Sequence, residues 1–143
     1  MRSLRRDQGR GQALVEFSLT LIIFLVLMMA IVDLGRGIYM YNGVSQAARE
    51  IARVASVYPG TTFGTSSQIT AEINTQKRLI PNLGTPTFAC VEIDGSAGLS
   101  SAGKCPVGAQ VTVSIVAPYQ PVTPVMGLVG TWNMQSSSSQ RMP

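Results

Sequence analysis

Hydrophobic and polar positions follow distinct patterns along this chain of 143 residues. Residues 17–32 carry no charged side chain, and the apolar stretch from 13 to 32 is interrupted by one charge, Glu16. About 20 apolar residues are the length that an α-helix needs to cross the ~30 Å hydrocarbon core of a bilayer. The pattern therefore predicts one transmembrane helix at about residues 13–32.

After Val32 the apolar and small residues recur every three or four positions, which is typical of one face of an amphipathic helix. They are Leu34, Ile38, Tyr41, Val44, Ala48, Ile51, Ala52 and Ala55. Pro59 ends the pattern because proline lacks a backbone N–H and restricts the residue before it. We therefore expect one helix over residues 12–58, about 68 Å long from 13 to 57 at 1.5 Å per residue.

The remaining residues, 59–143, predict a small α+β head. Thr65 and Gln68 have the spacing of a capping box, and the isoleucines that follow predict a short helix ending at Pro81. From Thr87 the period changes to two, as in strands. The segments predicted as strands are 87–94, 111–115 and 131–137, with an irregular connection from Pro118 onward. We expect a three-stranded antiparallel sheet packed on the outer half of the long helix.

The positive charge of the chain is concentrated at its N-terminus. The net charge is +4, and Arg2, Arg5, Arg6 and Arg10 all precede Gly11. Residues 12–143 hold 7 basic and 6 acidic side chains, so no basic surface remains that would favour nucleic acid as a partner. Arginines before the span predict a cytoplasmic N-terminus and an extracytoplasmic head. The expected location is a single-pass protein of the inner, cytoplasmic membrane.

A cleaved secretory signal is the other interpretation of the N-terminal segment. Its apolar region would be about 7–15 residues long and would end at a small-x-small site. The apolar run here is longer, and Met28-Met29-Ala30 is a poor cleavage site. A signal anchor fits the pattern better than a removed signal.

Glu16 is the one charge in the predicted span. A charge at the centre of a span costs roughly 2.5–3.5 kcal/mol, and less near the interface. Glu16 therefore either lies at the headgroup level or meets a positive partner in an assembly. Cleavage after Gly11 would leave a new α-amino group at Gln12, so that the carboxylate would stand at position five of the shortened chain. In a stack of staggered helices, one subunit's carboxylate could neutralise the next subunit's amine.

These residues also carry a family resemblance. The stretches that carry it are RGQALVEF at 10–17, DLGR at 33–36, Asn42 and AAREIAR at 47–53, with weaker likeness in VTVSI at 111–115 and PYQP at 118–121. Together they resemble the TadE-like minor pilins, or pseudopilins, of the Tad/Flp branch of type IV pili, strongly over the first 58 residues. The resemblance implies a pilin-like fold and a basic leader, residues 1–11, that a prepilin peptidase removes. It implies Gly11, Gln12, Glu16 and Phe17 as the processing site.

Charged residues further along the helix have two interpretations each. Asp33 and Arg36 are three positions apart and could form a weak local ion pair. Arg49 and Arg53 could lie on a solvated helix face. The resemblance implies the alternative that these residues, with Gln12 and Glu16, contact other subunits or the Tad inner-membrane assembly platform.

Cys90 and Cys105 both fall in the predicted head. A disulfide between them would close a loop of about 15 residues, which is worth roughly 3 kcal/mol in the chain-entropy model. Two buried free thiols or half of a metal site are the alternatives. Because the chain has no histidine and only two cysteines, it lacks the ligands of a structural zinc site. The disulfide is therefore favoured, and we expect no metal.

The sequence offers no credible active site. Without histidine, Ser-His and Cys-His nucleophilic arrangements are excluded. Glu92 and Asp94 resemble a carboxylate pair, but a solvated strand edge is the better interpretation. We expect neither enzyme activity nor a cofactor.

Three functions remain. The favoured one is a minor pilin needed to assemble a Tad-type pilus in adherence. Its expected partners are the prepilin peptidase, the assembly platform, other pilins or pseudopilins and the lipid bilayer. The alternatives are an uncleaved, signal-anchored binding or adhesive module, and a major subunit of the filament.

Overall fold

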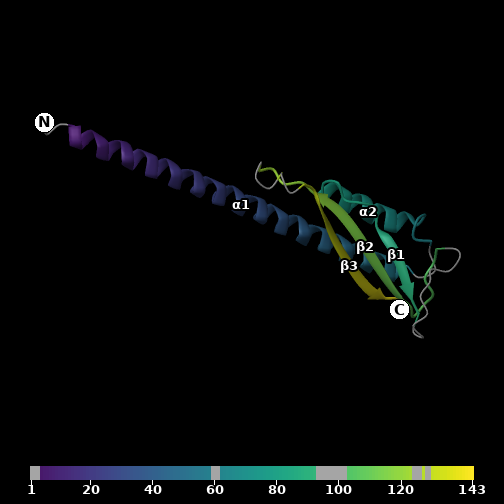
Figure 1. Cartoon of the computed structure of the whole chain (residues 1–143). Coiled ribbons are helices and arrows are strands. Elements are labelled where there is room, and N and C mark those ends of the chain that lie inside the picture. The colour runs from purple at the N-terminus through teal and green to yellow at the C-terminus, as the bar shows by residue number, and fades with distance from the viewer. Residues whose placement is uncertain (1–3, 59–61, 93–102, 124–126, 128–129) are drawn as a thin grey trace.

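A long helix carries a small α+β head on its C-terminal half (Figure 1). The computed structural model describes residues 4–58, 62–92, 103–123, 127 and 130–143, with side chains from residue 11 onward. The elements are α1 (Leu4–Val57), α2 (Ser67–Leu79), β1 (Thr87–Val91), β2 (Gln110–Tyr119) and β3 (Trp132–Arg141). This confirms the predicted α+β class, with a long N-terminal helix and a three-stranded antiparallel sheet.

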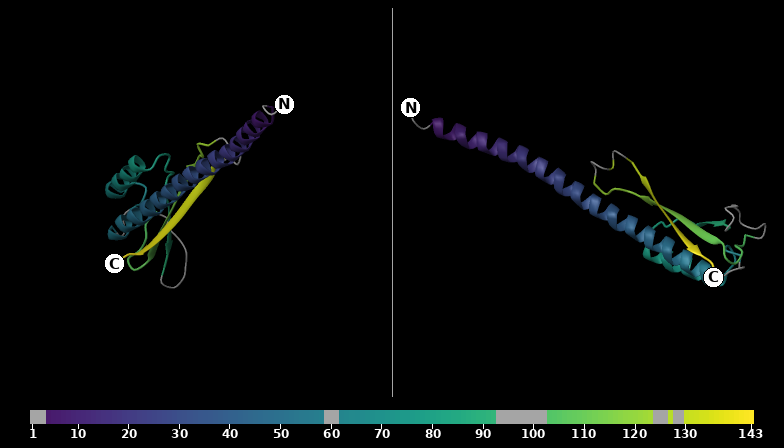
Figure 2. Two further views of the ribbon diagram at one scale, coloured as in Figure 1. Left: turned by 90° about the vertical axis from the view of Figure 1, so that its left-hand side faces the viewer. Right: turned by 90° about the horizontal axis from the view of Figure 1, so that it is seen from below.

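Helix α1 is continuous over 54 residues, about 80 Å at 1.5 Å per residue. It begins earlier than the expected residue 12 and includes residues 4–11 of the basic segment. Residues 11–29 are exposed on every side of the helix, whereas the head covers one face of residues 33–57 (Figure 2). The exposed apolar half is long and apolar enough to cross a membrane.

The sheet has the order β1-β2-β3, with both pairs antiparallel. Strand β2 continues through Pro118, where the sequence predicted an irregular connection, and that prediction is wrong. Strand β1 pairs with β2 only as far as Ser114, and Gly84 then donates its N–H to the carbonyl of Val116. Residues two apart in a strand direct their backbone N–H groups to the same edge. Pro118 therefore faces the edge of β2 that β1 no longer covers. A proline is tolerated there because no neighbour needs its missing N–H.

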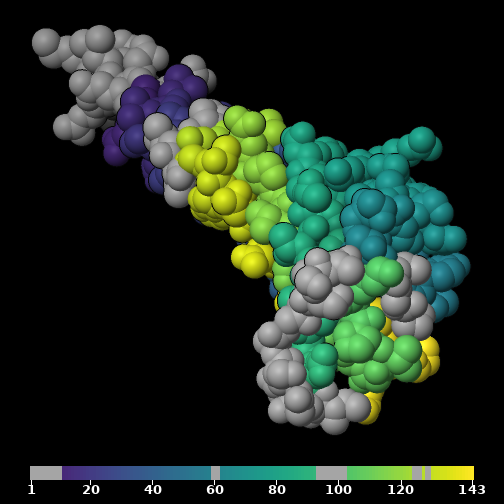
Figure 3. All heavy atoms as spheres, turned by 90° about the vertical axis from the view of Figure 1, so that its right-hand side faces the viewer, coloured from purple at the N-terminus to yellow at the C-terminus, as the bar shows by residue number. Residues whose placement is uncertain are grey.

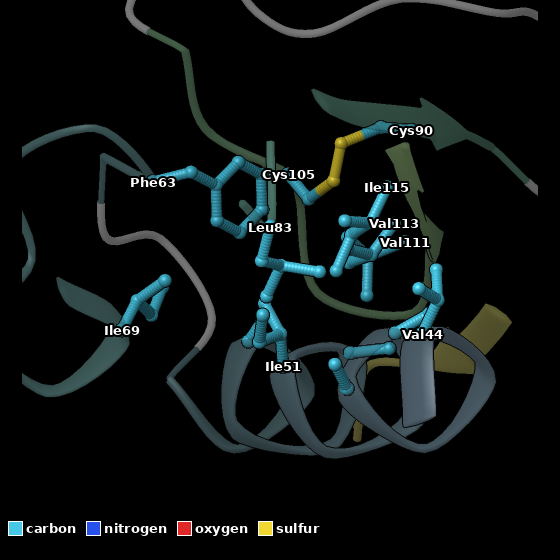
Figure 4. Packing of buried hydrophobic residues seen from close by; sticks show 14 of the residues in the cluster. Val44, Ile51, Phe63, Ile69, Leu83, Cys90, Cys105, Val111, Val113 and Ile115 are labelled. Carbon is cyan, nitrogen blue, oxygen red and sulfur yellow. A yellow bond between two sulfur atoms is a disulfide. The ribbon is translucent and has the colours of Figure 1, made fainter. Parts of the chain in front are cut away.

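The core lies between α1, β2 and α2 (Figure 4). One face of α1 contributes Val44, Ala47, Ala48, Ile51, Ala52 and Ala55, and alternate residues of β2 contribute Val111, Val113, Ile115 and Ala117. Full burial of one such valine or isoleucine stabilises the fold by about 1.5–3 kcal/mol. Most of the predicted helix stripe is therefore core. Its first three members, Leu34, Ile38 and Tyr41, stay exposed.

Strand β3 brings small residues to α1. Ser136 and Ser138 of β3 are half-buried and lie opposite Ile115 and Val113 of β2. Short side chains allow the helix and the strand to approach closely, so β3 packs on α1 without large apolar residues at these positions.

Helix α2 begins one residue later than the predicted capping box requires. Its N-cap is Ser66, which makes no side-chain capping bond, so the expected box of Thr65 and Gln68 is wrong. The backbone N–H of Thr65 bonds instead to the carbonyl of Thr62 in a turn, and the Gln68 side chain pairs with the Ser66 hydroxyl at 3.1 Å. Thr65 is therefore part of the turn that precedes α2 and is not the N-cap residue.

The predicted bridge is present, because Cys90 and Cys105 form a disulfide with a Cα–Cα distance of 5.8 Å. It joins β1 to the segment before β2, and both cysteines are buried. Glu92 lies exposed just after β1, and Asp94 falls outside the described residues.

Removal of this disulfide is expected to destabilise the head. With a sequence separation of 15 residues, the double substitution Cys90→Ala, Cys105→Ala should lower the free energy of unfolding by about 3 kcal/mol. Urea unfolding of the full chain in micelles, with and without a reductant, measures the difference. Reduction should shift the unfolding midpoint of the native protein and leave that of the double variant unchanged; equal midpoints for reduced and oxidised native protein would contradict the prediction.

Candidate processing and assembly segment

Gly11, Gln12, Glu16 and Phe17 all lie in α1 and are exposed. Residues four apart share one helix face, so the Glu16 side chain lies one turn beyond Gln12 on the same side. Among the residues whose side chains are described, none forms a hydrogen bond or an ion pair with the Glu16 carboxylate. The carboxylate is thus available to a group from outside this chain.

The two hydroxyl groups that follow Glu16 are satisfied within the helix. The Ser18 hydroxyl donates to the carbonyl of Leu14 at 2.7 Å, and the Thr20 hydroxyl donates to the carbonyl of Glu16 at 2.9 Å. Such back-bonding lets a hydroxyl enter an apolar environment without an unpaired donor. Glu16 therefore differs from Ser18 and Thr20, because no described side chain pairs with its carboxylate.

The fold supplies no reason for a glycine at position 11. A Cβ added there would meet no atom within 4 Å, other than the helix's own backbone, and the same holds at Gly35. Glycine inside a helix costs up to about 1 kcal/mol relative to alanine. No close contact at Gly11 requires a residue without a side chain, so packing within this chain does not compensate for the lower helix stability.

A second cluster joins α1 to the head at Asp33, the first residue after the uncharged stretch. Its side chain is only 2% exposed. The backbone N–H groups of Val122 and Thr123 donate to its two carboxylate oxygens at 3.1 Å each, and the Thr123 hydroxyl donates to the second oxygen. The Tyr119 hydroxyl donates to the backbone carbonyl of Asp33 at 2.8 Å. We refer to Asp33, Tyr119, Val122 and Thr123 as the helix–head clamp.

The electrostatics of the clamp favour a charged carboxylate. The hydrogen bond from the Thr123 hydroxyl lowers the pKa of Asp33 most, and the two backbone N–H groups add to it against the opposing effect of burial. Arg36 contributes least, since its guanidinium stands 3.7 Å from the carboxylate and is half exposed. The local Asp33–Arg36 pair is thus present and weak.

The clamp partners were not found from the sequence. The sequence pattern pairs Asp33 with Arg36 or with another subunit, whereas the structure places it against residues nearly ninety positions away. A signal existed in PYQPVT at 118–123, where a tyrosine and a threonine sit among prolines. Nothing in the spacing linked that segment to the helix.

Arg49 and Arg53 lie on the face of α1 that points away from the core. Arg53 pairs with Glu50 at 2.9 Å, and all three side chains are exposed. Exposed pairs of this kind are worth about 0–1 kcal/mol, so this face of the helix remains available to a partner.

Within the described ranges no three His, Cys, Asp or Glu side chains come together as a metal site would require.

The fold and these two clusters define a protein with one helix long and apolar enough to cross a membrane, clamped to a small α+β head. Residues 11–53 match the family model described as TadE-like protein. The match begins at Gly11 and takes in Glu16, Asp33, Arg36, Arg49 and Arg53. The resemblance to TadE-like pilins is therefore confirmed over this segment. No curated protein and no solved structure matches the chain.

Proposed function

We propose that this protein is a membrane-anchored minor pilin, or pseudopilin, of a Tad-type (Flp) pilus, processed by a prepilin peptidase after Gly11. The observation that carries the proposal is the exposed Glu16, which pairs with none of the described side chains, one helical turn beyond Gln12 in a segment that matches TadE-like proteins from residue 11 onward. Its role is structural and needs no chemistry from the head.

Charge balance explains why cleavage and assembly belong together. An unpaired carboxylate in the span costs a few kcal/mol, and cleavage after Gly11 would create the amine that offsets it. On one subunit the amine and the carboxylate are about 6 Å apart along the axis, at four residues of 1.5 Å each. A neighbouring helix displaced by that distance along the axis brings its amine level with the carboxylate.

The head then acts as the part that partners recognise. In the membrane it faces the extracytoplasmic side, with the N-terminal arginines on the cytoplasmic side. Its partners are other pilins or pseudopilins and the Tad inner-membrane assembly platform, which the exposed arginines of α1, Arg49 and Arg53, are free to contact.

Gly11→Ala is expected to abolish or strongly reduce processing. The substitution adds one methyl group to open space, so α1 keeps its structure and only recognition at the scissile bond changes. The measurement is the intact mass of the protein recovered from host membranes with an active peptidase. The native chain should lose residues 1–11, while Gly11→Ala should keep them.

Gly35→Ala is the matched control, because it too is an exposed glycine of α1 with open space for an added methyl group. It should be processed like the native chain. A full-length mass for the native protein would overturn the processing proposal and favour the uncleaved anchored module. The abundance of the protein in purified pili separates a minor from a major subunit.

A further inference from the structure

The end of the head next to the span is apolar. Val122, three residues after the end of β2, is 72% exposed, and Trp132, at the start of β3, is 40% exposed. The connecting sequence 120–131 contains no charged residue. In contrast, the charged residues Glu92, Lys104 and Arg141 lie near the opposite end of the sheet, where Gln110 of β2 pairs with Arg141.

The helix–head clamp fixes the height of this apolar end along α1. Val122 and Thr123 bond to the side chain of Asp33, and Tyr119 bonds to its backbone. Asp33 follows directly on the uncharged residues 17–32. The end of the head is therefore held where the hydrocarbon core of a membrane would end, and Figure 3 shows the green and yellow atoms of this end nearest the purple half of the helix.

Apolar and aromatic side chains gather on both sides of α1 at this height. A groove of about 230 Å³ is lined by Leu34, Ile38, Tyr41, Trp132 and Met134, together with Asp33, Gly37 and Tyr119. A cleft of about 860 Å³ on another side includes Val32, Arg36, Tyr39 and Val122 in its lining. Leu34 and Ile38 stand about 1.5–8 Å beyond Asp33 along the axis, and a headgroup layer is about 5–7 Å thick.

We propose that the membrane-proximal end of the head, defined by Val122 and Trp132, is seated in the headgroup layer of the bilayer beside the span. Its partner is the lipid surface itself. The exposed ring of Trp132 and the exposed rings of Tyr39 and Tyr41, which line the cleft and the groove from α1, match the aromatic belt of membrane proteins, where ring bodies meet acyl chains and polar tips meet water. Arg36 supplies a half-exposed positive charge at the level of the lipid phosphates. The seating rests on α1 spanning a membrane and does not depend on cleavage or on a pilus.

Trp132 reports on the seating directly because it is the only tryptophan of the chain. The full chain is placed in phosphatidylcholine–phosphatidylglycerol vesicles, with and without bromine near the headgroup end of the acyl chains. Brominated lipid should quench part of the Trp132 emission, because the ring of an interfacial tryptophan sits at the headgroup level. Unchanged emission together with full quenching by aqueous acrylamide would overturn the proposal.

A second copy of the chain on the same face is tested by dilution. Seating in lipid predicts bromine quenching that is independent of the protein-to-lipid ratio. Trp132 emission that is shielded from bromine at high protein density, and becomes quenched on dilution, would mean that another copy covers this face, and would also overturn the proposal.

Two matched variants test the contact. Val122 and Val107 are almost equally exposed, at 72% and 71%, but Val107 precedes β2 at the opposite end of the sheet. Val122→Asp should weaken bromine quenching of Trp132 because a carboxylate resists entry into the interface. Val107→Asp should leave it unchanged. Equal quenching in both variants would contradict the seating of Val122; circular dichroism establishes that each variant is folded, and the native measurement needs no substitution.

Discussion

Replacement of Asp33 by asparagine is expected to release the β2–β3 end of the head from α1. The carboxylate accepts hydrogen bonds on both oxygens, whereas an amide has one acceptor oxygen. At least one of the two backbone N–H groups, of Val122 or Thr123, then loses its partner. Asp33→Ala removes both acceptors and should release the segment more completely.

Amide hydrogen exchange measures this release at the bonds concerned. In the full chain, embedded in lipid nanodiscs, exchange at Val122 and Thr123 should accelerate by about tenfold or more in Asp33→Asn, because local opening sets the rate. The core residues Val111 and Val113 should keep their protection, since they are held by β1, β3 and the packing on α1.

Arg36→Gln is the control for charge alone. It removes a half-exposed guanidinium at 3.7 Å and leaves every N–H bond to the carboxylate in place. Exchange at Val122 should change little, as for other exposed ion pairs. An equal acceleration in Arg36→Gln and Asp33→Asn would show that the ion pair, and not the clamp, holds the loop.

Acid should open the same contact. Hydrogen bonds lower the pKa of Asp33, so its stabilising contribution is complete above the ordinary aspartate pKa of about 3.9. The contribution is lost as the pH falls through the lower, folded-state pKa. Protection of the Val122 amide, measured relative to its slower intrinsic exchange at low pH, should therefore fall only below about pH 4.

Glu16→Gln is expected to leave cleavage largely intact and to reduce incorporation into pili at least about tenfold, because an unpaired charge in the span costs about 2 kcal/mol or more and about 1.4 kcal/mol is a factor of ten. Glutamine keeps the shape of the side chain and removes its charge, so the new amine of the next subunit would lose its partner. The measurement is the ratio of the protein in sheared pili to that in membranes.

Glu92→Gln is the matched control for this experiment. Glu92 is an exposed carboxylate of the head, far along the chain from the span, so its loss should not change the ratio. Normal incorporation of Glu16→Gln would refute the charge-pair role and leave Glu16 as an interfacial residue. Loss of cleavage in the same variant would instead assign Glu16 to peptidase recognition.

The two expected effects address different parts of assembly. Under the proposed function, Glu16 acts in the contact between subunits within the apolar layer. Asp33 concerns the attachment of the head to its own helix, which decides how the head is presented to partners. A variant at one position should not reproduce the defect of the other.

Much of the secondary structure of this protein could be predicted from its sequence alone. The uncharged run to Val32, the stripe through Ile51 and the alternation around Val113 each follow from a local period, so the apolar and outer halves of the long helix and the central strand could be predicted. The two cysteines also favoured a bridge by composition. Local patterns of this kind are set by residues within a few positions of one another.

Features that depend on contacts between distant parts of the chain were decided only by the tertiary structure. Strand β2 extends past Pro118 because β1 leaves that edge open, and Ser66 caps α2 because the preceding turn occupies Thr65. Leu34 and Ile38 belong to the same apolar stripe in the sequence. They remain exposed because the buried apolar residues of α1 begin only at Val44. Above all, Asp33 is buried by Val122 and Thr123. No local period encodes a hydrogen bond between a helix and a loop so far along the chain, since such a contact exists only after the sheet has packed on α1.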